Sequence, residues 1–349
     1  PFKINEVVLP NRVIVAPMCQ YSAEEGNPTK WHYGHLQQLA FSGAGMIMME
    51  STSVNDDGRI TLKDLTIKDQ KNEHTLKKVV SYIKNLNNIP LGIQISHAGR
   101  KGSSHIPWDK PNYPLSPHEK SWQTFSASEI KRAAHWPRPN TLAANDILQL
   151  IDDYKNAAIK ADNIGFDCLE IHMAHGYLLH QFFSPISNKR NDSYGGNLTN
   201  RARFLLEIVR DVRQVWPRGK ILGARITGKD WLKGGITIDD AIWLARKLKD
   251  YGLDYVCVSS GGIKPKTNLV LQPGYQVHLA KKIKEKTGII TRTAGLIKNL
   301  SHASEIIESG SADLIAFGRK FVSEPTWLTN EIIQRNGKTP LPKQYIRCF

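Results

Sequence analysis

The sequence of this 349-residue chain predicts a (β/α)8 barrel, the closed arrangement within the α/β class that is often called a TIM barrel. Eight short runs of apolar and β-branched residues recur along the chain, and segments with helical periodicity lie between most of them. The runs are continuously apolar rather than alternating, which is typical of parallel strands buried on both faces. Eight such units within about 320 residues favour a closed barrel.

The expected strands and helices follow one another in regular order. We expect strands at Val13–Val15, Met46–Met49, Leu91–Ile95, Cys168–Ile171, Ile221–Ile226, Tyr255–Val258, Gly288–Thr291 and Leu314–Phe317. We expect helices at Leu36–Ser42, Asn72–Leu86, Ile147–Ile164, Asn200–Val215, Ile238–Tyr251, Tyr275–Lys286 and Ser301–Ser309. An open doubly wound sheet is the alternative, and it usually starts with a Gly-rich phosphate loop. The one candidate, Gly43-Ala44-Gly45, precedes a strand and lacks the third glycine, so we discount that fold.

One segment after the third strand interrupts this alternation. From about residue 101 to residue 145 no clean helical pattern appears, and Pro, Trp and Ser are frequent. Loops of this length inside a compact domain are usually functional. We therefore expect an irregular cap over the barrel mouth, within a single domain spanning residues 1–349.

The bulk composition argues against several classes of protein. The four cysteines are widely separated and form no CxxC, which disfavours a disulfide framework, an iron–sulfur cluster or a structural zinc site and indicates a cytoplasmic location. No apolar run approaches the length of a membrane span, and no export signal is visible. The net charge of +15 suggests either a polyanion partner or a Lys-rich solvated surface. We favour the second and expect no nucleic-acid partner, because the lysines are spread over helical segments without a nucleic-acid motif.

Polar residues and glycines follow nearly every predicted strand. In a (β/α)8 barrel the active site lies at the C-terminal ends of the strands. The densest group follows the fourth strand, where His172, His175 and Tyr177 fall within six residues. A structural loop rarely needs so many polar side chains beside a buried strand, because each must find a partner or stay hydrated. We therefore expect this loop to cover the active site.

The loops after the last two strands predict an anion site. In many barrels these loops bind phosphate through backbone N–H groups and a helix N-terminus. Gly295 and Gly318 let the backbone come close to a ligand, and Arg319 supplies a bidentate cation. The alternative is that both glycines are ordinary turn residues, and the presence of Arg319 weakens it.

Taken together, these residues resemble the old yellow enzyme family of FMN-dependent ene reductases. The resemblance runs from about residue 11 to residue 347. The motifs that carry it are Pro17-Met18-Cys19-Gln20-Tyr21-Ser22, Gln94-Ile95-Ser96-His97-Ala98-Gly99-Arg100-Lys101, His172-Met173-Ala174-His175-Gly176-Tyr177, Ser184-Pro185 through Gly195-Gly196, Val258-Ser259-Ser260-Gly261 and Phe317-Gly318-Arg319. Cys19, where other branches carry Thr, makes the chain similar to the bacterial subgroup described as NADPH dehydrogenases or xenobiotic reductases.

The resemblance implies noncovalently bound FMN at the barrel mouth, with NADPH or NADH as the hydride donor. The residues that it implies for cofactor binding are Pro17, Met18, Cys19 and Ser51 along the flavin ring, Gln94 at its pyrimidine edge, Arg225 near flavin N1, and Gly295, Gly318 and Arg319 at the phosphate. A positive charge near N1 would stabilise the anionic reduced flavin. Cys19 is implied to tune the flavin rather than to form a covalent adduct.

The resemblance also implies reduction of the C=C bond of α,β-unsaturated carbonyl compounds. His172 and His175 would donate hydrogen bonds to the carbonyl oxygen, while hydride from flavin N5 would reach the β-carbon. Tyr177, on the opposite face, would protonate the α-carbon. Tyr21 is implied as a second substrate contact.

The C-terminal tail and one strand position bear on assembly and substrate choice. The tail, from about residue 335 to residue 349, resembles that of the subgroup, whose arginine enters a neighbouring subunit's active site, so Arg347 implies a homodimer or a homotetramer. Arg292 stands where relatives usually have a small residue, and we expect it either to add a phosphate contact or to point outward. The cap segment 122–139 also departs from the family pattern, which leaves the pocket shape open.

Several alternatives remain open. His172 and His175 have a spacing that suits a metal, but no third ligand is evident, so we expect no metal site. A flavin-dependent reductase or oxygenase of an aromatic or other specialised substrate is the nearest rival. Amine dehydrogenases and dienoyl-CoA reductases add an iron–sulfur cysteine cluster that this chain lacks. A non-catalytic basic barrel that binds a polyanion is the rival from another class. A flavin-free aldolase would need a Schiff-base lysine at a strand end, and none of the eight runs contains one.

Overall fold

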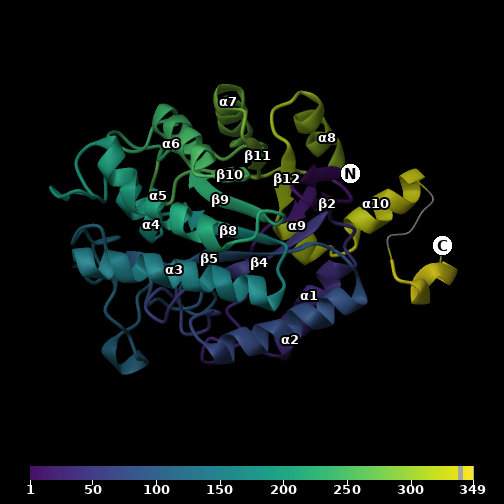
Figure 1. The fold of residues 1–349 in the computed structure, drawn as a ribbon, viewed down its shortest axis with the longest axis horizontal. Coiled ribbons are helices and arrows are strands. Elements are labelled where there is room, and N and C mark those ends of the chain that lie inside the picture. Colours follow the sequence, from purple (N-terminus) through teal and green to yellow (C-terminus); the bar gives the residue numbers. More distant parts are fainter. Residues whose placement is uncertain (337–340, 349) are drawn as a thin grey trace.

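The computed structural model describes residues 1–336 and 341–348 and confirms the (β/α)8 barrel (Figure 1). Its parallel strands close in the order β10-β11-β12-β3-β4-β5-β8-β9, so each strand lies beside its neighbours in the chain. The strands are β3 (Val13–Val15), β4 (Met46–Ser53), β5 (Leu91–Ser96), β8 (Cys168–Met173), β9 (Ile221–Thr227), β10 (Tyr255–Ser259), β11 (Ile290–Thr293) and β12 (Leu314–Phe317). The predicted run at residues 288–291 was placed two residues too early, because Gly288 is the C-cap of the preceding helix.

The helices pack around the outside of the barrel (Figure 1). They are α1 (Lys30–Ala40), α2 (Gln70–Leu86), α3 (Ala144–Ile164), α4 (Leu178–Phe183), α5 (Leu198–Val215), α6 (Ile238–Asp250), α7 (Val277–Thr287), α8 (Leu300–Glu308), α9 (Arg319–Ser323) and α10 (Trp327–Asn336). Several begin where the sequence supplies a cap: the side chains of Asp69, Asn197 and Thr237 accept hydrogen bonds from backbone N–H groups of the first turns of α2, α5 and α6. The first helix begins at Lys30, six residues before the predicted start.

The barrel interior is packed rather than hollow. One apolar cluster is formed by residues at alternate positions along the strands, namely Ile14, Ala16, Met46, Met48, Cys168, Ile221, Tyr255, Cys257, Leu314 and Ala316, together with Ile4 and Leu9. A second, larger cluster lies between the strands and the helices. The alternation arises because successive side chains of a strand point to opposite faces.

A hairpin that the sequence did not predict closes one end of the barrel. Strands β1 (Phe2–Ile4) and β2 (Val7–Leu9) pair antiparallel. Ile4 and Leu9 are buried in the same cluster as residues at the N-terminal ends of the barrel strands. The hairpin is also tied to the start of β9, where Glu6 N–H donates to Gly219 O at 3.0 Å.

The irregular segment after β5 contacts the opposite end. It contains the 3-10 turns η1 (Gly99–Lys101) and η2 (Pro117–Glu119). It also contains two paired strands of two residues each, β6 (Phe125–Ser126) and β7 (Asn140–Thr141). The buried guanidinium of Arg100 donates to Ile130 O at 2.9 Å and to Ile263 O at 2.8 Å, which joins this cap to the loop after β10. Trp108 of the cap packs edge-on against Tyr21, with 5.7 Å between ring centroids.

Arg292 corrects a prediction. It neither contacts the phosphate loop nor points outward, because its side chain is fully buried inside the barrel and forms an ion pair with Glu170. Register explains this: Arg292 of β11 pairs with Cys257 of β10, whose side chain also belongs to the interior cluster. Burial opposes the charge of Arg292, but Cys257 and Glu170 outweigh it and raise the pKa of the guanidinium well above its usual value.

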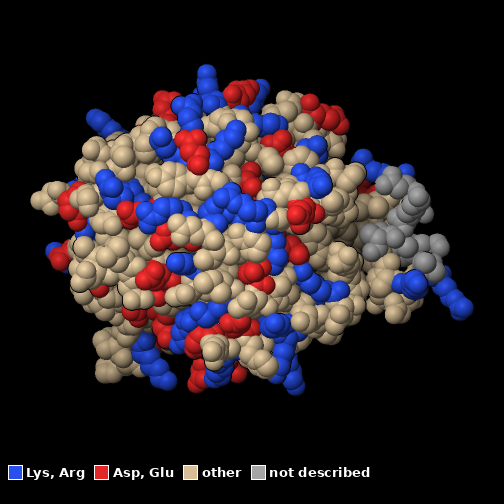
Figure 2. All heavy atoms as spheres, in the orientation of Figure 1, with Lys and Arg blue, Asp and Glu red and all other residues tan. Residues whose placement is uncertain are grey.

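The surface shows how the excess positive charge is distributed. On the face drawn in Figure 2, Lys and Arg are interspersed with Asp and Glu rather than gathered in one patch. This arrangement favours a solvated basic surface over a site for an extended polyanion. Among the helices formed by residues 1–336 and 341–348, none has the length and apolar character needed to cross a membrane.

Candidate functional site

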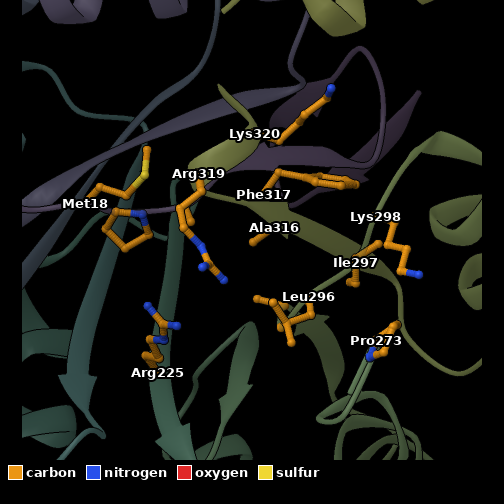
Figure 3. A pocket seen from close by; sticks show the side chains of 15 residues that line it. Met18, Arg225, Pro273, Leu296, Ile297, Lys298, Ala316, Phe317, Arg319 and Lys320 are labelled. Atoms are coloured by element: carbon orange, nitrogen blue, oxygen red, sulfur yellow. The ribbon is translucent and has the colours of Figure 1, made fainter. Parts of the chain in front are cut away.

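A cavity of about 510 Å³ lies at the C-terminal ends of β12, β3 and β11, where the barrel architecture predicts a site. Most of the residues predicted to hold a cofactor line it: Pro17, Met18, Arg225, Gly295, Gly318 and Arg319. Arg225 of β9 and Arg319 at the start of α9 point their guanidinium groups into the same space (Figure 3).

The lining of this cavity is strongly basic. Arg225, Lys298, Arg319 and Lys320 contribute to it, and its lining includes no Asp or Glu from the described part of the chain. Lys320 is partly neutralised by Glu324 at 2.6 Å. In the first turn of α9, which starts at Arg319, the N–H of Phe321 donates to Gly318 O at 2.9 Å, whereas the N–H groups of Arg319 and Lys320 precede every carbonyl that the helix could offer them. An anion such as a phosphate monoester matches this combination of cations and free backbone donors.

The residues expected to act on substrate meet beside Arg225. His172 on β8 pairs in register with Arg225 on β9. The rings of His175 and Tyr177 pack edge-on against His172, with centroid distances of 5.0 and 4.7 Å. The loop bends sharply here, with a positive φ at both His175 and Gly176. Gly176 has no room for a side chain, because a Cβ there would overlap the carbonyl group of Gly262.

The hydrogen bonds of His172 fix its tautomer. Its Nδ1 accepts a hydrogen bond from Ala174 N–H at 3.1 Å, so Nδ1 cannot carry a proton. Burial lowers the pKa of His172 well below its usual value, and the charge of Arg225 lowers it further. The imidazole is therefore neutral, and Nε2 carries its one N–H.

His175 interacts with the last residue of β10. Its Nε2 lies 2.6 Å from Ser259 Oγ, and Ser259 Oγ lies 3.1 Å from Gln276 Oε1. Burial and the nearby Arg225 lower the pKa of His175 well below its usual value, so this imidazole is also neutral. Gln276 Oε1 can only accept, so the Ser259 hydroxyl donates to it and Ser259 Oγ accepts from His175 Nε2–H, which leaves Nδ1 unprotonated.

Tyr177 lies next to Lys101, the last residue of the motif that begins within β5. Burial raises the pKa of Tyr177 well above its usual value, so its hydroxyl stays protonated. Lys101 Nζ lies 4.7 Å from the centroid of the Tyr177 ring and donates to His175 O at 2.7 Å. Burial, with Arg132 and Arg100 nearby, lowers the pKa of Lys101 to about 7.

The remaining predicted residues of the first motif lie around Cys19. Burial, Asp64 and Glu50 raise the pKa of the Cys19 thiol well above its usual value, so it is not ionised. The side chain of Tyr21 interacts with Cys19, and Tyr21 has a positive φ. Ser51 Oγ is bonded to Ser96 Oγ at 2.6 Å and is buried.

Two predicted residues lie outside this group. Gln94 is in the barrel interior, where its Nε2 donates to Glu170 Oε1 at 2.7 Å. Arg347 is exposed on the turn η3 (Lys343–Cys348) and does not line the cavity of its own chain. The segment near the C-terminus lies at the edge of the molecule (Figure 1). Residues 337–340 and 349 of the predicted tail lie outside the described residues.

Sequence reasoning missed several residues that hold the site. Ser259, the last residue of β10, stands in one of the family motifs, which gave it no role, and Gln276 is the N-cap of α7. Together they position His175, and no single motif joins them. His180 and Asp230 form a buried pair at 2.9 Å below the loop, and His180 Nδ1 accepts from Gly176 N–H at 2.8 Å. Lys101 was visible in the sequence, because it follows Arg100 directly at the end of a strand motif.

The cavity fits a flavin mononucleotide. Arg225 Nε is buried without a hydrogen-bond partner, so the protein alone leaves a donor unused beside the cavity. A cofactor that combines an aromatic ring with a phosphate would meet apolar lining such as Met18 and Ala316, and cations such as Arg319. Within residues 1–336 and 341–348, no group of three or more His, Cys, Asp or Glu is arranged to hold a metal ion.

Comparison with known proteins gives consistent results. A family model described as the NADH:flavin oxidoreductase / NADH oxidase family matches residues 1–336. An NADPH dehydrogenase of Bacillus subtilis (strain 168) is 36% identical over 349 residues, covering 99% of this chain and 97% of that protein. An NADPH dehydrogenase of Clostridium acetobutylicum is 36% identical over 352 residues, covering 100% and 98%.

Solved structures share the fold. An old yellow enzyme homologue from Zymomonas mobilis superposes with a TM-score of 0.80 at 22% identity, covering 99% of this chain and 94% of that one. Morphinone reductase in complex with tetrahydroNAD superposes with a TM-score of 0.78 at 23% identity, covering 98% and 92%. At these identities the structural likeness is evidence for the fold alone.

Proposed function

The chain belongs to the NADH:flavin oxidoreductase / NADH oxidase family as an FMN-dependent oxidoreductase of the old yellow enzyme type, and we propose that it reduces the C=C bond of α,β-unsaturated carbonyl compounds. It uses NADPH or NADH as reductant and acts on small molecules. Bound FMN supplies the hydride for the alkene. The protein must then bind the carbonyl group, polarise it and deliver one proton.

The observation that carries this proposal is the pair of neutral imidazoles beside an un-ionised phenol. The tautomer of His172 makes its Nε2–H a donor, and a carbonyl oxygen is the acceptor that such a donor suits. Because Ser260 Oγ also donates to Gln276 Oε1, we propose that carbonyl binding turns the Ser259 hydroxyl toward His175 Nε2, so that Nδ1 carries the ring proton and becomes the second donor. Two hydrogen bonds to the carbonyl oxygen would stabilise the negative charge that develops there as hydride adds to the β-carbon.

Tyr177 completes the addition. Because burial keeps its hydroxyl protonated, it can give a proton to the α-carbon as the enolate charge collapses. One hydride at the β-carbon and one proton at the α-carbon convert the alkene to the saturated carbonyl compound. The phenolate of Tyr177 is then reprotonated from solvent.

The residues around the cavity would hold the cofactor. We propose that Arg319, Gly318 and Gly295 bind the phosphate and that Pro17, Met18, Cys19 and Ser51 line the ring. Arg225 connects the cofactor cavity with the substrate-binding histidines, since it lines the cavity and lies in register with His172. Its cation would stabilise negative charge on the reduced ring, which favours hydride uptake from the nicotinamide.

An anaerobic titration tests the proposed function. We expect the purified protein to show flavin absorbance bands that bleach with NADPH and return when cyclohexenone is added, with cyclohexanone as the product. A protein that bleaches with NADPH but is not reoxidised by cyclohexenone, or by other activated alkenes, would contradict alkene reduction while leaving the family assignment in place. Saturated cyclohexanone is the matched control, because it offers the same carbonyl group without a C=C bond.

A further inference from the structure

Four buried polar side chains form a chain of hydrogen bonds inside the barrel, below the mouth. Gln94 Nε2 donates to Glu170 Oε1 at 2.7 Å, and Glu170 Oε2 accepts from Tyr255 Oη at 2.7 Å and from Arg292 Nη2. Arg292 Nη1 also lies 3.3 Å from Tyr255 Oη. All four side chains are at most 2% exposed. They come from the four strands β5, β8, β10 and β11.

Arg292 and Tyr255 determine the chemical state of Glu170. A carboxylate buried this deeply would take up a proton if it had no cationic partner. The ion pair with Arg292 stabilises the ionised form, and the Tyr255 hydroxyl satisfies a further lone pair on the same oxygen. An ionised carboxylate can only accept hydrogen bonds.

The ionised carboxylate in turn fixes the orientation of the Gln94 amide. Because Glu170 Oε1 must receive a donor, the amide presents its nitrogen to Glu170 and its carbonyl oxygen to the other side. Gln94 stands two residues before Ser96, whose hydroxyl bonds Ser51 on the wall of the proposed ring site. The Oε1 atom of Gln94 is therefore free to accept a hydrogen bond from a ligand group on the mouth side of the barrel.

We propose that Glu170 and Arg292 are positioning residues for FMN, which act by holding the Gln94 amide oxygen toward the mouth as the acceptor for the imide N–H of the flavin ring. This inference rests on the proposed function and on the placement of the flavin ring against Gln94 that the family resemblance implies. A neutral or absent residue at position 170 would leave the amide free to rotate by half a turn. It would then offer a donor to the imide N–H, and a hydrogen bond would become a repulsive contact.

The decisive variant removes both charges together. In Glu170→Gln/Arg292→Met no unpaired charge is left in the barrel, so the fold is expected to survive. The amide introduced at position 170 can accept or donate, and the orientation of Gln94 is no longer specified. We expect FMN to bind the apoprotein about tenfold more weakly, measured by quenching of FMN fluorescence, with the thermal midpoint of the apoprotein close to that of the wild type.

A second readout separates positioning from a general loss of packing. With 15N-labelled FMN, the imide proton resonance of the wild-type complex should show a strong hydrogen bond, and in the double variant it should move toward the value of free FMN. The matched control is Arg213→Met/Asp254→Asn. This pair is another arginine–carboxylate contact, at 3.7 Å, with Arg213 nearly fully buried on α5 outside the barrel. It should change neither the FMN affinity nor the imide resonance.

Tyr255→Phe decides the question if the double variant does not fold. It keeps both charges and the ring and removes one hydrogen bond to Glu170, so FMN binding should weaken by about threefold. Unchanged FMN affinity and an unchanged imide resonance, in whichever of these variants is folded, would overturn the inference.

Gln94→Ala distinguishes failure of this inference from failure of the ring placement. Weaker FMN binding in Gln94→Ala is expected if the ring lies against Gln94. Weaker binding in Gln94→Ala with wild-type affinity in the charge-pair variant would overturn the role of Glu170 and Arg292 alone. Wild-type affinity in Gln94→Ala would overturn the placement of the ring and the positioning role with it.

Discussion

Tyr177 places a protonated hydroxyl beside the neutral imidazole of His172. We expect Tyr177→Phe to slow alkene reduction by about 10²- to 10⁴-fold, which is the usual contribution of a positioned general acid. Reduction by NADPH requires no proton from Tyr177, so that half-reaction should keep its wild-type rate. Stopped-flow measurements of the two half-reactions, each started from one defined oxidation state, test both statements.

The control for this variant is Tyr194→Phe. Tyr194 donates its hydroxyl to Glu207 of α5 at 3.1 Å and packs against the cluster between the strands and the helices, so its loss should leave both half-reactions unchanged. If Tyr177→Phe slowed both half-reactions by the same factor, Tyr177 would not be the specific proton donor.

Lys101 gives the site a pH dependence that stability measurements can detect. Its pKa is lowered from the ordinary 10.5 to about 7, so between these values the unfolded chain binds a proton that the folded chain does not. The free energy of unfolding should therefore rise with pH above about 7, by less than about 1.4 kcal/mol per pH unit because the side chain keeps some contact with solvent. Urea denaturation at pH 7, 8 and 9 should show a shallower rise in Lys101→Met.

The exposed Lys77 on α2 provides the comparison for Lys101. Lys77→Met should retain the wild-type slope of stability against pH. Identical slopes in the wild type and Lys101→Met would mean that the Lys101 ammonium is as well solvated in the folded chain as in the unfolded one.

Among the elements, the cap and the loop after β10 are joined through one side chain. Arg100→Met removes the donors to Ile130 O and Ile263 O and should lower the free energy of unfolding by about 1–3 kcal/mol, because it leaves backbone carbonyls unpaired. Hydrogen exchange should rise in the cap near residue 130 and near residue 263. Faster exchange throughout the barrel would contradict this local role.

The elements also show what the sequence could predict. Continuous apolar runs identified the barrel strands, because a parallel strand buried on both faces has no polar side to interrupt it. The hairpin at residues 2–9 was missed, since two three-residue strands carry too little pattern. The strand β11 was displaced because the boundary between the helix cap Gly288 and the strand shows no change in composition.

Only those parts of the candidate site whose residues are close together in the chain were predicted from the sequence. His172, His175 and Tyr177 are close in the chain, so their cluster was visible in one short stretch. Arg292 is separated from Glu170 by 122 residues, and its inward direction depends on the register of a closed barrel. Local pattern carries no information about such a pair, and both expectations for Arg292 were wrong.

At the scale of the whole molecule, we propose that Arg347 serves the site of a second copy in a homodimer or homotetramer. Arg347 is exposed, and the turn that carries it contacts its own barrel through Tyr345, whose ring centroid lies 6.0 Å from that of Phe41. Arg347→Ala should raise KM for the alkene while FMN binding stays unchanged. Sedimentation velocity should show a species larger than the 39.3 kDa chain.

Mixed oligomers test whether Arg347 acts across subunits. A chain with Arg347→Ala, co-expressed in equal amounts with a chain carrying Tyr177→Phe, should restore activity at about a quarter of the sites, because half of the random dimers contain one site with neither change. No restoration would contradict action across subunits. Co-expression of the Tyr177→Phe chain with Tyr177→Phe/Arg347→Ala is the control, since no site then has an intact Tyr177.

The hairpin of β1 and β2 has a kinetic consequence. Because Ile4 and Leu9 seal the N-terminal end of the barrel, the reductant and the alkene must enter and leave through the same mouth. They would then occupy it in turn, and each would exclude the other at high concentration. Double-reciprocal plots at several fixed concentrations of NADPH should give parallel lines, and excess alkene should inhibit in competition with the nicotinamide.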